Sequence, residues 1–112
     1  MTQEHKELLL KDLSARFPYN VAIDCRDEDS RFTCYLTTDI LKEIQNNTCY
    51  WNYKPYLFPM SSMTEEQRKE YGLVLCGELS INQYDWLNAH HFDYRGLIPM
   101  GLANDATGLN IY

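Results

Sequence analysis

The sequence has few cationic residues, and they are scattered along the chain. Ten Lys and Arg residues stand against 16 Asp and Glu residues, which gives a formal net charge of −6. The longest cationic run is the pair Arg68–Lys69. A surface that neutralises nucleic-acid phosphates needs clustered Lys and Arg, so the sequence argues against direct nucleic-acid binding. An acidic surface suits docking on a basic partner, but it is also ordinary for solubility, which is the favoured interpretation.

Long apolar runs are also missing. No run approaches the ~20 residues that a membrane-spanning helix needs, and residues 1–13 carry too many charges for the apolar part of a secretory signal. The sequence therefore predicts no membrane contact and a cytoplasmic location. Internal repeats and linkers are absent, and 112 residues fit one domain. We expect a single domain over residues 1–112.

The spacing of cysteine and histidine gives no sign of a metal centre. The four cysteines lie too far apart for the CxxC pairs of zinc and redox motifs, and buried thiols are the expectation. His90 and His91 are adjacent, so on a helix their rings would point about 100° apart and would not share one ion. At a helix C-terminus cationic histidine is favoured instead. We predict no metal and no cofactor.

A catalytic constellation is not recognisable either. Cys34 or Cys76 with His90 or His91 would supply a thiol nucleophile and its base, but nothing in their spacing brings them together. The glycines at 101 and 108 lack the lysine and the spacing of a phosphate-binding loop. We therefore predict no catalytic residues. An enzyme that uses His90 or His91 remains the weakest alternative.

What the sequence does contain is the pattern of a small α+β domain. Leu9, Leu13 and Phe17 recur every four residues and predict a helix over residues 2–17, which Pro18 ends. Residues 21–25 and 31–37 predict an antiparallel hairpin around an acidic turn. Thr38 is expected to cap a short helix over 39–45, and the aromatic run 48–53 to form a third strand. Prolines make 54–59 an extended strap across the core.

Capping boxes predict two further helices in the second half of the chain. One begins at Ser62 or, in an overlapping frame, at Thr64, and the other begins at Ser80 and runs to His90 or His91. We expect an irregular C-terminal segment with a turn over 94–98, a loop over 104–108 and a docked terminal strand at 109–112. The predicted fold is thus a single α+β domain with an N-terminal helix and a short antiparallel sheet of about three strands.

Three stretches resemble a known family. They are MTQEHKELLLKDLSARFPY at 1–19, KPYLFPMSSMTEEQ at 54–67 and HHFDYRGLIPMGLANDATGLNIY at 90–112. In these the chain resembles a family of short uncharacterised proteins of Bacteroides-type gut bacteria and their phages and mobile elements. The resemblance implies an intracellular setting and a phage or mobile-element role, and it supplies no catalytic residues.

The candidate binding residues lie mainly in the last of these stretches. Arg95 is the only cation after Lys69, so it is either a structural partner of Asp93 or the anion-binding residue of a pocket. The extended segment 54–59 could also be a docking site. The candidate residues for binding a ligand or a partner are Asp93, Tyr94, Arg95, His90, His91 and Tyr56.

These features predict a protein that acts by binding. The first hypothesis is an accessory module of phage or mobile-element type that binds a host protein and interferes with a defence or regulatory system. The alternative is a protein that binds or sequesters a small anionic metabolite or nucleotide, with Arg95 and neighbouring tyrosines forming its pocket. A homodimer is a natural way for so small a domain to bury more apolar surface.

Overall fold

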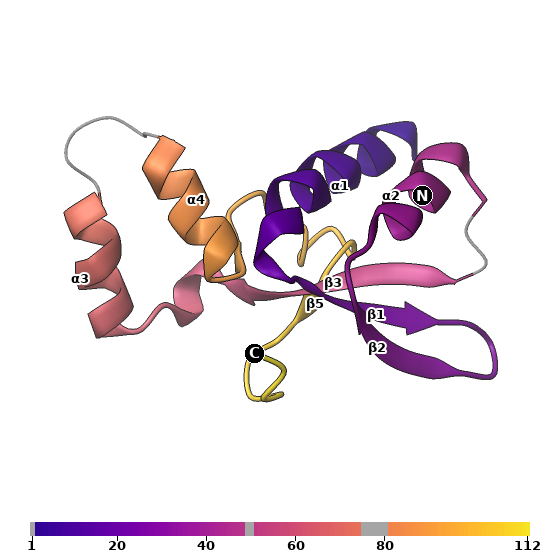
Figure 1. The fold of residues 1–112 in the computed structure, drawn as a ribbon. Helices are drawn as coiled ribbons and strands as arrows, with labels where there is room; N and C mark the ends of the chain where they lie inside the picture. Colours follow the sequence, from indigo (N-terminus) through magenta and orange to yellow (C-terminus); the bar gives the residue numbers. More distant parts are fainter. Residues whose placement is uncertain (1, 49–50, 75–80) are drawn as a thin grey trace.

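The computed structural model describes residues 2–48, 51–74 and 81–112, and in these ranges it confirms the predicted α+β class. Four helices and a mixed sheet of five strands make up the described fold (Figure 1). The helices are α1 (Gln3–Arg16), α2 (Thr38–Asn46), α3 (Glu65–Val74) and α4 (Ile81–Ala89). The strands are β1 (Ala22–Arg26), β2 (Arg31–Tyr35), β3 (Asn52–Pro59), β4 (Phe92–Asp93) and β5 (Asn104–Asp105).

The N-terminal helix forms as predicted. The hydroxyl of Thr2 accepts a hydrogen bond from the backbone N–H of His5 at 3.1 Å and caps α1. Leu9 and Leu13 are buried on its inner side. The α-helix ends at Arg16, because Pro18 cannot continue it, and a single 3₁₀ turn follows.

The predicted hairpin is confirmed and forms one side of a larger sheet, with β2 at the edge. β1 pairs antiparallel with β2 on one side and with β3 on the other. In the acidic turn, the Asp27 carboxylate accepts hydrogen bonds from the backbone N–H groups of Asp29 at 2.8 Å and Ser30 at 2.6 Å. β3 then pairs in parallel with β4 and β5, so the sheet is mixed and has more than the three strands expected.

The third strand lies later in the chain than the sequence predicts. β3 runs over Asn52–Pro59, whereas the predicted strand over 48–53 overlaps it only at its end, and residues 49 and 50 lie outside the described ranges. The supposed strap over 54–59 is therefore the strand itself. Its prolines fit because Pro55 forms the last pair with β1, opposite Ile23, and Pro59 ends the strand. A missing N–H is tolerated where a strand changes partner or stops.

The predicted caps agree with the structure in one case and differ by one residue in another. Thr64 and Gln67 exchange hydrogen bonds between side chain and backbone at 2.9 and 3.1 Å, so the second of the two overlapping capping boxes starts α3. α2 is capped by Thr37 rather than Thr38. The capping box proposed at Ser80 begins outside the described residues.

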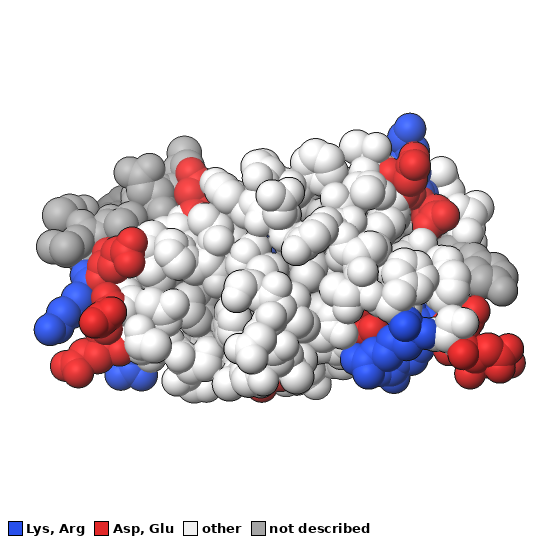
Figure 2. Space-filling model, turned by 60° about the horizontal axis from the view of Figure 1, so that its bottom comes forward, with Lys and Arg blue, Asp and Glu red and all other residues white. Residues whose placement is uncertain are grey.

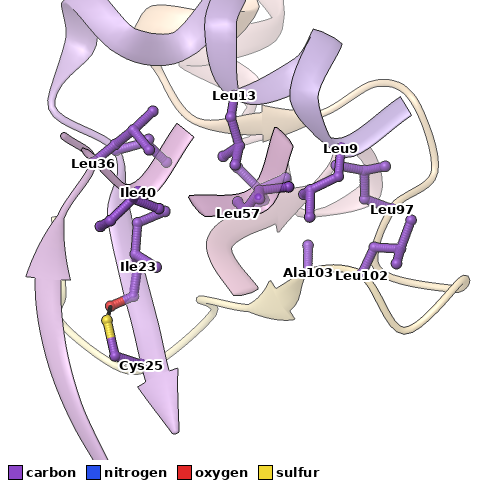
Figure 3. Close-up of a cluster of buried hydrophobic side chains, with 12 residues drawn as sticks. Leu9, Leu13, Ile23, Cys25, Leu36, Ile40, Leu57, Leu97, Leu102 and Ala103 are labelled. Carbon is purple, nitrogen blue, oxygen red and sulfur yellow. Dashed lines mark hydrogen bonds between the residues drawn. The ribbon is translucent and has the colours of Figure 1, made fainter. Parts of the chain in front are cut away.

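The sheet is covered on both faces. α1 and α2 lie over one face (Figure 1), where leucine, isoleucine and alanine side chains from α1, α2, β1, β3 and residues 97–103 form the main core (Figure 3). The C-terminal segment covers the other face, and Ala106 packs there against Ala22 and Tyr56. α3 and α4 form a pair at one end of the molecule (Figure 1).

The C-terminal segment is docked without forming the terminal strand expected over 109–112. The Tyr112 hydroxyl accepts a hydrogen bond from the backbone N–H of Ala22 at 2.8 Å and donates one to the carbonyl of Tyr56 at 2.7 Å. These bonds tie the last residue to both β1 and β3. Within the described ranges, none of the helices combines the length and apolarity needed to span a bilayer.

Candidate functional site

A buried carboxylate on α1 brings two arginines together. Asp12 and Arg16 have fully buried side chains and form a two-pronged ion pair, with Arg16 Nε and Nη2 at 2.7 and 3.1 Å from the two oxygens. Arg95 Nε reaches the same carboxylate at 3.1 Å. Because one carboxylate meets two guanidinium groups, the trio carries one excess positive charge. In a chain of net charge −6, this is a local site of the opposite sign.

Tyr94 lies at the centre of this network. Its ring is 5.3 Å from the Arg16 Cζ and 4.9 Å from the Arg95 Cζ, within the range of cation–π contacts. Its hydroxyl accepts a hydrogen bond from Arg95 at 3.1 Å and donates one to Asn88 at 3.0 Å. The network therefore joins α1, α4 and the segment after β4.

A pocket of about 580 Å³ opens beside this network, between α1 and α4. Its volume falls within the ~300–1,000 Å³ of pockets that hold small molecules. The Tyr84 and Tyr94 rings lie 5.4 Å apart at its wall. The lining residues are Lys11, Ala15, Tyr84, Asp85, Asn88, Tyr94 and Arg95. The lining holds two cations against the one carboxylate of Asp85, and with its two aromatic rings it can hold an anion carrying a flat ring.

Asp93 does not pair with Arg95, contrary to the structural pairing that sequence proximity suggested. Its buried carboxylate accepts hydrogen bonds from the backbone N–H groups of Leu97 and Ile98, both at 2.9 Å. Arg95 instead reaches across to Asp12, 83 residues earlier. Asp93 therefore organises the following turn, because free N–H groups four and five residues ahead satisfy its oxygens.

The two histidines take different positions after α4. The His90 ring stacks on Trp86 with centroids 4.1 Å apart, and its Nδ1 lies 2.9 Å from the Trp86 carbonyl. His91 stacks on Tyr112 with centroids 3.6 Å apart. Burial, the Arg16 charge and the neighbouring His90 lower the pKa of His91 to about 4. The expectation of a cationic C-terminal histidine is therefore wrong for His91, because burial outweighs the helix dipole.

Tyr56 lies apart from the pocket. Its side chain is buried against Ala22 and Ala106 on the face of the sheet that the C-terminal segment covers. Its hydroxyl accepts a hydrogen bond from Arg31 at 3.2 Å. Of the six candidate residues, Tyr94 and Arg95 line the pocket, whereas Asp93, His90, His91 and Tyr56 do not.

The residues that sequence reasoning missed come from the helices beside the pocket. Asp12 and Arg16 are spaced i, i+4 on the side of α1 that also buries Leu9 and Leu13. A charged pair at the edge of an apolar stripe was a usable signal of burial, since buried charges are normally paired. Tyr84 on α4 gave no comparable signal, because only the tertiary fold brings it beside Tyr94.

In the described ranges the potential metal ligands lie apart, whereas two of the cysteines lie together. No group of three or more potential His, Cys, Asp and Glu ligands gathers among these residues. Cys25 and Cys34 are free thiols with sulfur atoms 3.0 Å apart. Burial, followed by the contact with Cys34, raises the pKa of Cys25 to about 12, which keeps this thiol protonated and a poor nucleophile. Cys76 lies outside the described residues.

A second candidate is a face of the molecule with few charges. In Figure 2, the Lys, Arg, Asp and Glu side chains gather at the two ends of this face, over α3 and over the β1–β2 hairpin. The middle, over the C-terminal segment, is almost free of them.

A comparison of the chain with protein-family models, curated proteins and solved structures gives no match.

Proposed function

We propose that this protein acts by binding a host protein through the middle of the face in Figure 2, over the C-terminal segment, which we call the uncharged face. The main support is the distribution of charge on this face. The chain has a net charge of −6, yet the charged side chains lie toward the ends of the face and almost none lie in its middle. After Arg95 the sequence contains a single charged side chain, Asp105. The cores of protein interfaces are likewise depleted in charged residues and rich in aromatic ones.

Exposed apolar side chains on this side of the sheet support the proposal. Tyr35, Leu109 and Tyr112 are 58%, 52% and 42% exposed. Tyr112 docks on β1 and β3, and its hydroxyl bonds to Ala22, the residue that Tyr35 faces across the β1–β2 pair. Tyrosine offers a large and rigid contact surface with a polar end. A partner that covers this surface would bury apolar area at little cost in side-chain entropy.

The resemblance to short proteins of gut Bacteroides-type bacteria and their phages and mobile elements suggests the kind of partner. In that setting an accessory protein that binds a host defence or regulatory protein is the role we favour. A small chain rich in tyrosine and without a recognised catalytic constellation suits such a role.

The test compares two substitutions at exposed apolar positions. Leu109→Glu places a charge on the proposed face. Met100→Glu is the control: it places the same charge away from this face, at a residue that is 45% exposed and lies beside His5 and Leu9 on the α1 side. The tagged variants are used to capture proteins from a Bacteroides-type host lysate. We expect a recurrent host protein with wild type and Met100→Glu, and its loss with Leu109→Glu. Equal capture by all three proteins would rule out this face.

The pocket at Arg95 favours a second candidate function, the binding of a small anionic ligand such as a nucleotide. Its support is the excess positive charge beside the paired rings of Tyr84 and Tyr94. An enzyme that uses His90 or His91 has less support, because both rings are engaged in stacking.

Arg95→Ala tests this second function without breaking the ion pair between Asp12 and Arg16. A bound nucleotide should lose affinity about tenfold or more, as expected for a lost hydrogen bond to a charged group. Lys69→Ala, on α3, is the matched control. The measurement is titration calorimetry with nucleoside monophosphates and diphosphates. Unchanged affinity in the folded Arg95→Ala variant would exclude the pocket.

A further inference from the structure

β2 is an edge strand of the sheet. Among the described strands, β2 pairs only with β1. Two backbone hydrogen bonds, from Leu36 to Val21 at 3.0 Å and from Asp27 to Ser30 at 2.9 Å, identify which cross-strand pairs are hydrogen-bonded. Antiparallel pairs alternate between bonded and non-bonded. With the observed register, the backbone N–H and C=O groups that point away from β1 belong to Arg31, Thr33 and Tyr35.

This edge carries little of the usual protection against pairing. β2 contains no proline, and its one charged residue, Arg31, turns its guanidinium toward Asp24 at 2.9 Å and Tyr56 at 3.2 Å. Phe32 and Tyr35 are 45% and 58% exposed. Natural sheets normally block such edges with proline, bulges or several charged side chains. An exposed and regular edge strand is a template for another strand.

We propose that β2 pairs antiparallel with β2 of a second copy of this chain, about a two-fold axis at Thr33. This register satisfies the outward backbone groups of all three residues at once. It sets Arg31 of one copy opposite Tyr35 of the other, a favourable contact between a cation and an aromatic ring. Phe32 then faces Cys34 across the junction, so no two like charges meet within the strand.

Other registers are worse, which favours a second copy at this register. Shifting the strands so that Arg31 meets Arg31 opposes like charges, which is destabilising. Every shifted antiparallel register leaves part of the outward N–H and C=O groups of the five-residue strand unpaired. The sequence of β2 is thus complementary to itself, as an isologous interface requires.

This inference concerns the strand edge and goes beyond the proposed function, which uses the adjacent face. The two can fail separately, because self-association is measured on purified protein with no host component. If the chain captures a host protein but stays strictly monomeric, the proposed function stands and the proposal of β2 pairing is wrong.

The experiment is sedimentation equilibrium of wild type and two proline variants, from micromolar to millimolar concentration. Thr33→Pro removes an outward N–H while leaving the bonds to β1, whereas the matched control Thr38→Pro falls at the first position of α2, where proline is favoured. We expect a monomer–dimer equilibrium for wild type and Thr38→Pro. The dissociation constant of Thr33→Pro should rise about tenfold or more.

A charge pair tests the register and does not depend on proline being tolerated. Thr33→Lys and Thr33→Glu each place like charges opposite each other at the axis, so each should be monomeric alone, while their mixture should form a heterodimer. The proposal is overturned if wild type remains monomeric at millimolar concentration. It is also overturned if Thr33→Pro is folded and dimerises as wild type does, or if the mixed charge variants fail to associate.

Discussion

Asp12 is the single residue on which the region between α1 and α4 depends most. Its carboxylate is fully buried and is bonded to Arg16 and Arg95. A buried charge that loses its partner is far more costly than a surface pair, which contributes little. Stability around the pocket is therefore concentrated in one side chain rather than spread over many surface charges.

Asp12→Ala should lower the free energy of unfolding by about 3–5 kcal/mol, because it leaves the buried Arg16 guanidinium without its counter-charge. Glu7→Ala, at an exposed position of the same helix, should change it by less than about 0.5 kcal/mol. Urea denaturation measures both values. Similar small effects in the two variants would mean that water reaches Arg16 and replaces Asp12.

His91 should make the stability of the protein depend on pH. Its pKa is lowered to about 4 in the folded state, from an ordinary value near 6.5. The unfolded chain therefore binds the proton more readily, so stability is fully present above about pH 6.5 and is lost as pH falls toward 4. His91→Asn should lose this component, since asparagine does not titrate and tolerates the positive φ of 62° at this position.

The measurement for His91 is the thermal unfolding midpoint at several pH values between 4 and 7. His5→Asn in the first turn of α1 serves as the control for removing a histidine. A His91→Asn variant that loses stability over this range as steeply as wild type would contradict the assignment of the effect to His91.

At the scale of elements, the sequence predicted the extended conformation of β3 but not its pairing in the sheet. Proline patterns correctly indicated that 54–59 is extended, because proline excludes helix in this context. They did not reveal a strand, since pairing depends on β1, β4 and β5, which lie elsewhere in the chain. The two-residue strands β4 and β5 are too short to leave a periodic pattern.

The C-terminal segment is held as an element by the hydroxyl of Tyr112. Tyr112→Phe removes two hydrogen bonds and leaves the buried N–H of Ala22 without its partner. We expect a loss of about 1–3 kcal/mol in the free energy of unfolding. Tyr35→Phe, at a ring that is 58% exposed, is the matched control and should have little effect. Equal stability of both variants in urea would show that packing alone docks this segment.

At the scale of the whole molecule, the fold encloses a packed interior and gives a surface with charged ends and an uncharged face between them. The molecule is elongated, about 44 × 27 × 23 Å, and in the view of Figure 2 its charges lie toward the two ends of the long direction. The main core lies under α1 and α2, and a smaller cluster around Trp86 and Phe92 lies at the α3–α4 end. The uncharged face is thus a property of the assembled molecule, since no single element contains it.

The sequence by itself determined the local structure of this protein. Capping residues, four-residue apolar spacing and Pro18 indicated α1, α2 and the start of α3, and two strand patterns around an acidic turn indicated the β1–β2 hairpin. All of these depend on neighbours within a few residues. Only the tertiary structure decided the partners of β3, the pairing of Arg95 with Asp12 and the pocket beside Tyr84. These depend on residues up to 83 positions apart, and a favourable pairing across such distances is set by packing rather than by spacing.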